Sequence, residues 1–167
     1  MDISSSTLYN FVLPPFKAAI DANVKTVMNS FNIVNGVPAT GNKFLQRDIL
    51  KNKWSFSGFV ISDWGSAFEM IAHGYAENLK HAGELAVTAG SDMDMESHAY
   101  IIHLKESVEE GTVDVKLIDD AVRRILKVKF ELGLFDDPYK YCDPKRSEKL
   151  LYHKDPVSYT HLRAHET

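Results

Sequence analysis

The stretch Gly58–Ser62 (GFVIS), followed directly by Asp63-Trp64-Gly65, decides the fold of this 167-residue chain. Its apolar residues run without interruption over the length of a strand, and residues that favour turns lie on both sides. Such a continuous apolar run is typical of a strand that is buried on both faces, as in a parallel sheet. We therefore predict a parallel strand that ends at Asp63.

The segments before this strand alternate between helical and extended patterns. Residues 43–54 carry an apolar stripe with charges on the other face, which predicts a helix. Residues 32–42 (NIVNGVPATGN) are dense in Asn, Gly and Pro and predict a loop. Residues 24–31 (VKTVMNSF) predict a short buried strand. Residues 7–22 predict a helix that two consecutive prolines break, because proline lacks a backbone donor and clashes with the preceding turn.

The segments after Asp63 continue the same alternation. Gly74 and Gly83 weaken the helical pattern of the stretch 67–89. After it come a short third strand, a helix, and a second helix with one apolar face. The predicted elements are a helix over 67–89, a strand over 91–95, and helices over 98–109 and 114–132. Strands separated by helices indicate an α/β fold in which helices pack on a parallel sheet.

Composition and charge exclude several classes of protein. The formal net charge is −4, from 19 Lys+Arg against 23 Asp+Glu, and no basic arm stands out, so we expect no nucleic-acid partner. The single cysteine, Cys142, excludes an internal disulfide and a cysteine-based zinc site. No apolar run is long enough to cross a membrane, so we expect no membrane partner. The first residues do not resemble a signal peptide, and a true start at Met1 would make the chain cytoplasmic.

Asp63 is the strongest candidate for chemistry. In parallel α/β folds, ligands bind beyond the carboxyl ends of the strands, which is where Asp63 is expected. Trp64 beside it offers an apolar face to a ring-shaped substrate. The alternative is that Asp63 only caps the helix that follows.

Two further groups of polar residues allow two interpretations each. The amides of Asn29, Asn32 and Asn35 follow the first strand, where they would hydrogen-bond either sugar hydroxyls or the backbone of a tight loop. The carboxylates Asp92, Asp94 and Glu96 alternate along the third strand and would share one face. Such oxygens suit a divalent cation, but the spacing matches no calcium loop, so buried hydrogen bonds or helix capping are favoured.

Three segments together resemble glycoside hydrolase family 3, the β-glucosidase family. They are VMNSFNIVNGVPATGNKFLQRDILKNKWSFSGFVISDWGS at 27–66, AGSDMDM at 89–95, and IDDAVRRILKVKFELGLFDDPY at 118–139. The resemblance implies that the chain is part of a (β/α)8 barrel, similar to the last three or so of its strand–helix units. It also implies hydrolysis of β-linked glycosides with retention of configuration, through a covalent glycosyl-enzyme intermediate.

The same resemblance implies roles for four residues. Asp63, in the SDW motif, corresponds to the catalytic nucleophile. Trp64, Met28 and Phe31 correspond to residues that bind the substrate. Many family members have tyrosine where this chain has Phe31, so a hydroxyl that would reach the nucleophile is missing here. The mechanism requires no metal and no cofactor.

The resemblance also predicts how the chain is divided. Residues 1–134 are expected to form part of the family's N-terminal barrel domain, and 135–155 the start of an interdomain linker. Residues 156–167 (PVSYTHLRAHET) have no counterpart in the family and are expected to be a non-native, adapter-derived tail. A full barrel needs about 250 residues, so the chain is expected to be a fragment of a longer enzyme.

The expected substrate of the intact enzyme is a β-glucoside or a short β-glucan, with β-xylosidase activity as an alternative within the family. The expected partner is the missing second domain of the same full-length chain, and the acid/base carboxyl is expected outside the matched segments. Without it, the chain alone would be a catalytically inert half-barrel. A periplasmic or secreted location for the intact protein is implied by the resemblance only.

Overall fold

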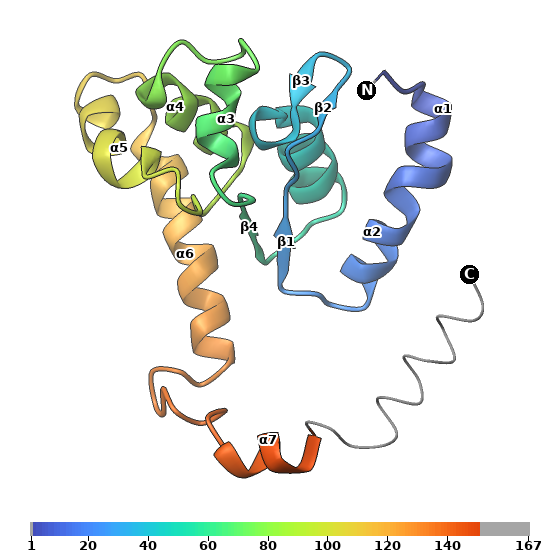
Figure 1. Cartoon of the computed structure of the whole chain (residues 1–167), viewed down its shortest axis with the longest axis vertical. Coiled ribbons are helices and arrows are strands. Elements are labelled where there is room, and N and C mark those ends of the chain that lie inside the picture. The colour runs from blue at the N-terminus through green and yellow to red at the C-terminus, as the bar shows by residue number, and fades with distance from the viewer. Residues whose placement is uncertain (1, 151–167) are drawn as a thin grey trace. The chain divides into compact units, whose positions relative to one another are not determined.

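The computed structural model describes residues 2–150 (Figure 1), so the predicted tail at 156–167 and the end of the predicted linker lie outside the described residues. The chain divides into two compact units, Met1–Val128 and Lys129–Thr167. The helices are α1 (Ser5–Thr7), η1 (Leu8–Val12), α2 (Leu13–Asp21), η2 (Ala39–Gly41), η3 (Phe44–Lys53), α3 (Ser66–Ala72), α4 (Leu79–Ala89), α5 (Ala99–Glu109), α6 (Val115–Glu131) and α7 (Pro144–Leu150). The strands are β1 (Thr26–Met28), β2 (Ile33–Val34), β3 (Val37–Pro38) and β4 (Phe59–Ile61).

A short parallel sheet forms the centre of the first unit. Strand β1 pairs with β4, and Met28 lies opposite Ile61. A single parallel bridge joins Ile61 to Met93 on the other side of β4. The prediction of an α/β fold with parallel pairing is therefore confirmed, while the strand expected over 91–95 is reduced to that one bridge.

Strand β1 is less buried than the sequence predicts. Thr26 and Met28 are exposed and Val27 is half-buried. Within the described residues, β1 pairs only with β4, so its other edge and one of its faces lack the neighbours that would bury them. The prediction of a buried strand over 24–31 is wrong in this respect.

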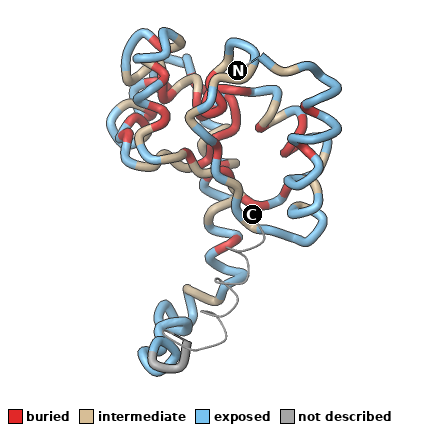
Figure 2. Tube along the Cα trace, turned by 45° about the vertical axis from the view of Figure 1, so that its right-hand side comes forward, coloured by how far each residue is buried: buried red, intermediate tan, exposed pale blue. Residues whose placement is uncertain are grey.

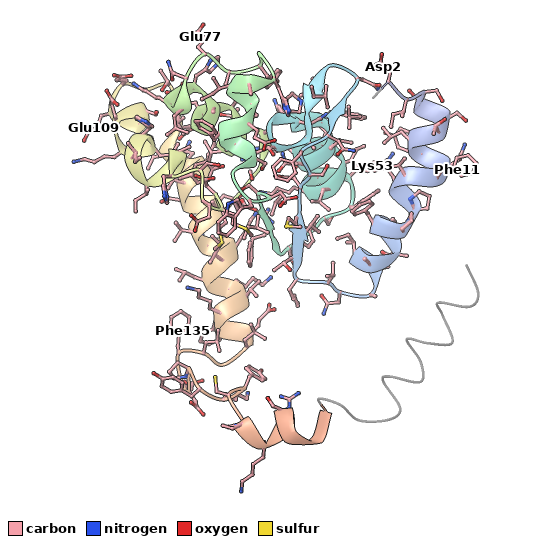
Figure 3. All side chains as sticks on the ribbon, in the orientation of Figure 1. Asp2, Phe11, Lys53, Glu77, Glu109 and Phe135 are labelled. Atoms are coloured by element: carbon pink, nitrogen blue, oxygen red, sulfur yellow. The ribbon has the colours of Figure 1, made fainter. Side chains whose placement is uncertain are left out.

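The N-terminal helix is continuous through its prolines, so the predicted break is also wrong. Leu13 donates its N–H to the carbonyl of Leu8, five residues back, which makes η1 a π-helical turn. Pro14 and Pro15 are the second and third residues of α2, in the first turn, where the N–H groups have no partner within that helix. Phe11 projects outward from this helix and is exposed (Figure 3).

The segment predicted as a loop over 32–42 contains a hairpin. Strands β2 and β3 are antiparallel and are joined by Asn35 and Gly36, both with positive φ. Positive φ at both central residues is the property of a type I′ turn, for which Asn-Gly is the favoured dipeptide. The signal for this hairpin is therefore in the sequence, although strands of two residues are too short for an apolar pattern to reveal them.

The helix expected over 67–89 is two helices. Gly74, with φ of +68°, lies between α3 and α4. Gly83 lies inside α4, where an added Cβ would come within 3.2 Å of Ala99 Cβ, so glycine allows α4 and α5 to pack closely. Buried residues of α3 and α4, among them Met70 and Ala82, form one apolar cluster, and Figure 2 colours the buried parts of the chain red.

Helix α6 matches the predicted helix over 114–132, but its apolar face is only partly covered. Ala121 is buried, whereas Val122 and Leu126 are exposed. In the second unit, α7 lies within the segment predicted as a linker, and Tyr141 donates its hydroxyl to the carbonyl of Leu132 at 3.1 Å.

Candidate active site

Asp63 lies two residues beyond the end of β4, at the carboxyl edge of the sheet. Its side chain is half-buried, and Oδ1 accepts a hydrogen bond from the N–H of Trp64 at 2.7 Å. Helix α3 has Gly65 as its N-cap residue, with no side-chain hydrogen bond. Asp63 therefore does not cap that helix, and among the described residues Oδ2 has no hydrogen-bond donor.

The loop that carries Asp63 is held from the neighbouring segment. Ser62, which is buried, donates its N–H to the carbonyl of Met93 at 2.9 Å, and its Oγ accepts from the N–H of Met95 at 2.7 Å. Gly65 donates its N–H to the carbonyl of Met95 at 2.8 Å. The residues on both sides of Asp63 are thus tied to the segment that follows α4, which fixes the backbone of the loop.

The three expected substrate-binding residues lie near the same edge of the sheet. Trp64 is 64 % exposed and Met28 is 53 % exposed, while Phe31 is half-buried. Met28 ends β1, and its register partner Ile61 ends β4 two residues before Asp63. The carboxyl ends of the two strands therefore bring Met28 to the edge that presents Asp63 and Trp64, and Phe31 follows Met28 in the segment beyond β1.

The three asparagines have different environments. Asn29 is buried, and its side chain hydrogen-bonds four groups described below. Asn35 holds the N-terminal segment, since its Oδ1 accepts from the N–H of Ile3 at 2.8 Å and its Nδ2 donates to the carbonyl of Ile3 at 3.1 Å. Asn32 is exposed, and its carbonyl accepts from the N–H of Ala39 at 2.9 Å. Asn35 therefore bonds backbone, as one alternative predicts, but the backbone is that of the distant Ile3 and not of its own loop.

The three acidic residues do not share one face, contrary to that part of the sequence prediction. Asp92 is buried, its Oδ1 accepts from Lys51 Nζ at 2.6 Å, and its Oδ2 accepts from the N–H of Val60 at 2.8 Å. Asp94 Oδ2 accepts from the N–H of Tyr100 at 3.4 Å, and Glu96 is exposed with a left-handed backbone. Residues 2–150 contain no cluster of three His, Cys, Asp or Glu side chains suited to a metal ion.

Lys51 is the largest departure from the sequence interpretation, which placed it on the charged outer face of its helix. Its side chain and that of Asp92 are 3 % and 2 % exposed. Burial lowers the pKa of Lys51, and the Asp92 carboxylate opposes that shift. The pair joins η3 to the segment beside β4 beneath the candidate site.

Tyr100 hydrogen-bonds the same segment, and its phenol makes the stability of the folded chain depend on pH. Its hydroxyl donates to the carbonyl of Ser91 at 2.7 Å, and burial, with the nearby charge of Asp94, raises the pKa of the phenol well above 10.0. The unfolded chain ionises this phenol near its ordinary value while the folded chain keeps it protonated. Tyr100 thus contributes stability that is complete below about pH 10 and is lost as the pH rises further.

We expect Tyr100→Phe to flatten this alkaline loss of stability. Urea unfolding of the chain at several pH values between neutrality and pH 11 measures it. At neutral pH the variant is expected to lose about 1 kcal/mol, because the Ser91 carbonyl loses its donor. An equally steep alkaline loss in both proteins would contradict the assignment.

Comparison with known proteins identifies the family. The model of the glycosyl hydrolase family 3 N-terminal domain matches residues 1–128. The chain belongs to glycoside hydrolase family 3. A periplasmic β-glucosidase from Salmonella typhimurium is 40% identical over 150 residues, covering 90% of this chain and 20% of that protein. A β-xylosidase from Formosa agariphila is 37% identical over 156 residues, covering 88% of this chain and 22% of that protein.

Solved structures of the family agree with the fold. The crystal structure of a β-glucosidase from Listeria innocua matches with a TM-score of 0.86 and 44% identity, covering 90% of this chain and 21% of that enzyme. A variant of the same enzyme has been solved in complex with laminaribiose. The family 3 chain described here spans about a fifth of the length of the curated relatives it matches. In its described part, no helix is long and apolar enough to cross a membrane.

Proposed function

We propose that this family 3 chain carries the nucleophile of a retaining β-glycosidase, with Asp63 as that nucleophile. The observation that supports this assignment most is the position of its carboxylate. It stands at the carboxyl end of a central parallel strand, where one oxygen is fixed by the N–H of Trp64 at 2.7 Å and the other has no donor among the described residues. An oriented but uncommitted carboxylate oxygen is what nucleophilic attack requires.

In the proposed reaction, Asp63 Oδ2 attacks the anomeric carbon of a β-glycoside. A bond forms between that oxygen and the carbon, the bond to the leaving oxygen breaks, and a second carboxylic acid donates its proton to the leaving group. Water, deprotonated by the same second group, then hydrolyses the ester and releases the sugar with its original configuration. In retaining enzymes the two carboxyl groups lie about 5 Å apart. We expect the second one to come from a part of the longer protein outside this chain.

The neighbouring residues have proposed roles in binding. Trp64 presents an exposed aromatic face to the sugar or its leaving group, and Met28 and Phe31 would contact the sugar from the end of β1 and the segment that follows it. Phe31 offers only an apolar contact, since it has no hydroxyl. We further propose that β1, β4 and the Met93 bridge belong to the last three or so strand–helix units of a (β/α)8 barrel, which would cover the exposed face of β1.

The proposed substrate is a β-glucoside or a short β-glucan, and the proposed location of the intact protein is periplasmic or secreted. Relatives named as β-glucosidase and as β-xylosidase both match, so the sugar is tested by comparing aryl glucosides with aryl xylosides. Activity is best measured in a chimera in which residues 2–128 replace the matching segment of the Listeria innocua β-glucosidase. We expect the 167-residue chain alone to lack turnover.

The test of the nucleophile is covalent trapping in the chimera. An activated glucoside with fluorine in place of the hydroxyl beside the anomeric carbon forms the ester but hydrolyses it slowly, so the ester accumulates. Mass spectrometry of the digested protein is expected to find the fluorosugar on the peptide that contains Asp63. The Asp63→Asn chimera is expected to remain unlabelled, whereas Asp119→Asn, an exposed change on α6, is expected to label normally. Label on another carboxylate would overturn the assignment.

A further inference from the structure

We propose that Asn29 is a positioning residue for Asp63, which it holds through a buried chain of hydrogen bonds completed by Thr40 and Ser66. The proposal rests on the proposed function of Asp63 as nucleophile. It concerns residues that have no catalytic chemistry of their own and that do not belong to the exposed edge where the substrate is expected. The positioning role is inferred from the buried contacts that these residues make with the backbone around Asp63.

Asn29 contacts β4 twice at the point where that strand ends. Its backbone N–H donates to the carbonyl of Ile61 at 3.0 Å, which extends the β1–β4 ladder by one residue. Its side-chain Oδ1 then accepts from the N–H of Asp63 at 3.4 Å. One buried residue therefore holds both the last residue of the strand and the residue that carries the carboxylate.

The same oxygen continues the chain of bonds toward α3. The one hydroxyl hydrogen of Thr40 is shared between two acceptors, Asn29 Oδ1 at 3.0 Å and Ser66 Oγ at 2.8 Å. Thr40 and Ser66 are both buried, and Ser66 is the first residue of α3. Asp63 therefore lies between two anchored points, its own N–H and the start of the helix that follows.

The donor end of the Asn29 amide fixes its orientation. Nδ2 donates to Ser91 Oγ at 3.1 Å and to Gln46 Oε1 at 3.4 Å. Gln46 Nε2 in turn donates to the carbonyls of Ala39 and Thr40, both at 2.9 Å. Only a side chain with two donors and an acceptor oxygen satisfies all these partners, so a carboxylate or an apolar group cannot replace the amide. A fully satisfied buried network of this kind is rigid.

Rigidity at this position matters for catalysis because the attacking oxygen must reach the anomeric carbon along one line. A displacement of about 1 Å costs as much as about 10²-fold in rate. Such a loss appears in the rate of the chemical step, while binding of the sugar by other residues changes little. A role confined to folding would instead lower the amount of folded protein and leave the rate per folded molecule unchanged.

The experiment uses the chimera and the fluoroglucoside described above. The labelling rate at saturating reagent reports nucleophilic attack, and the concentration for half-maximal rate reports binding. For Asn29→Leu we expect the saturating rate to fall about 10- to 100-fold and the half-saturating concentration to change by less than about twofold. For Thr40→Val the saturating labelling rate is expected to fall less. Thr40→Ser keeps the hydroxyl and is expected to retain most of the parent rate.

Ser107→Ala is the control, because Ser107 is a buried polar residue of α5 outside this network, with its hydroxyl donating to the carbonyl of His103 at 3.1 Å. It is expected to lower thermal stability while it labels at close to the parent rate. Equal labelling rates in Asn29→Leu and Ser107→Ala, or a loss confined to half-saturation, would overturn the positioning role. Labelling that persists in Asp63→Asn would instead overturn the proposed function, so the two failures are distinguishable.

Discussion

Replacing Asp63 with glycine in the chimera is expected to lower kcat/KM for an aryl β-glucoside by at least about 10⁴-fold, the size of loss seen when one member of a catalytic set is removed. The physical reason is that the covalent path disappears with the carboxylate that makes the attack. The loss is expected in kcat, with little change in stability, because Asp63 is half-buried and makes one side-chain hydrogen bond. Initial rates with a dinitrophenyl glucoside measure it.

A small anion gives this prediction a positive control. Glycine leaves space for azide, which is expected to attack the anomeric carbon from the side that Asp63 occupied. A carbon–nitrogen bond then forms, and dinitrophenolate leaves with the electron pair of the broken bond. The expected product is the α-glucosyl azide, opposite in configuration to the substrate. Full activity of Asp63→Gly without azide, or a β-glucosyl azide as product, would contradict the assignment.

Sequence reasoning placed Asp63 at the end of a strand because the signal is local. An uninterrupted apolar run predicts the strand at Gly58–Ser62, and the next residue is then placed at its carboxyl end. Only glycine fits at position 58, where the predicted strand begins, since a Cβ there would come within 2.0 Å of the carbonyl oxygen of Lys25. The long helix α6 was predictable for the same reason, as its apolar period continues over several turns.

The network around Asn29 could not be predicted in this way. Asn29 is 62 positions from Ser91 and 17 from Gln46, and no periodicity links them. An asparagine beside a loop is as typical of a turn as of a buried network, so its environment depends on which segments fold against it. The burial of β1 was mispredicted for a related reason: burial depends on neighbours that the described residues do not supply.

Lys51 illustrates the opposite kind of error, in which a local rule is overridden. A lysine in an amphipathic helix is usually solvated, but here η3 packs its Lys51 side chain against Asp92, with Nζ 2.6 Å from Oδ1. Two charges removed from water are tolerated only when they pair with each other and their remaining polar atoms also have hydrogen-bond partners. Asp92 meets the second condition, because its other oxygen accepts from the N–H of Val60 at 2.8 Å. The pair thereby fixes the position of β4 relative to η3.

Lys51→Met is therefore expected to lower the free energy of unfolding by about 3–5 kcal/mol, the cost of leaving one buried charge without its partner. Urea unfolding of the chain, followed by tryptophan fluorescence, measures it. The double variant Lys51→Met/Asp92→Asn removes both charges, and its amide still accepts from the N–H of Val60. We expect it to be more stable than Lys51→Met alone, since the loss comes from an uncompensated carboxylate rather than from lost packing. If the double variant were no more stable than the single one, packing by the lysine stem would be the main contribution of Lys51, and the ion pair a minor one.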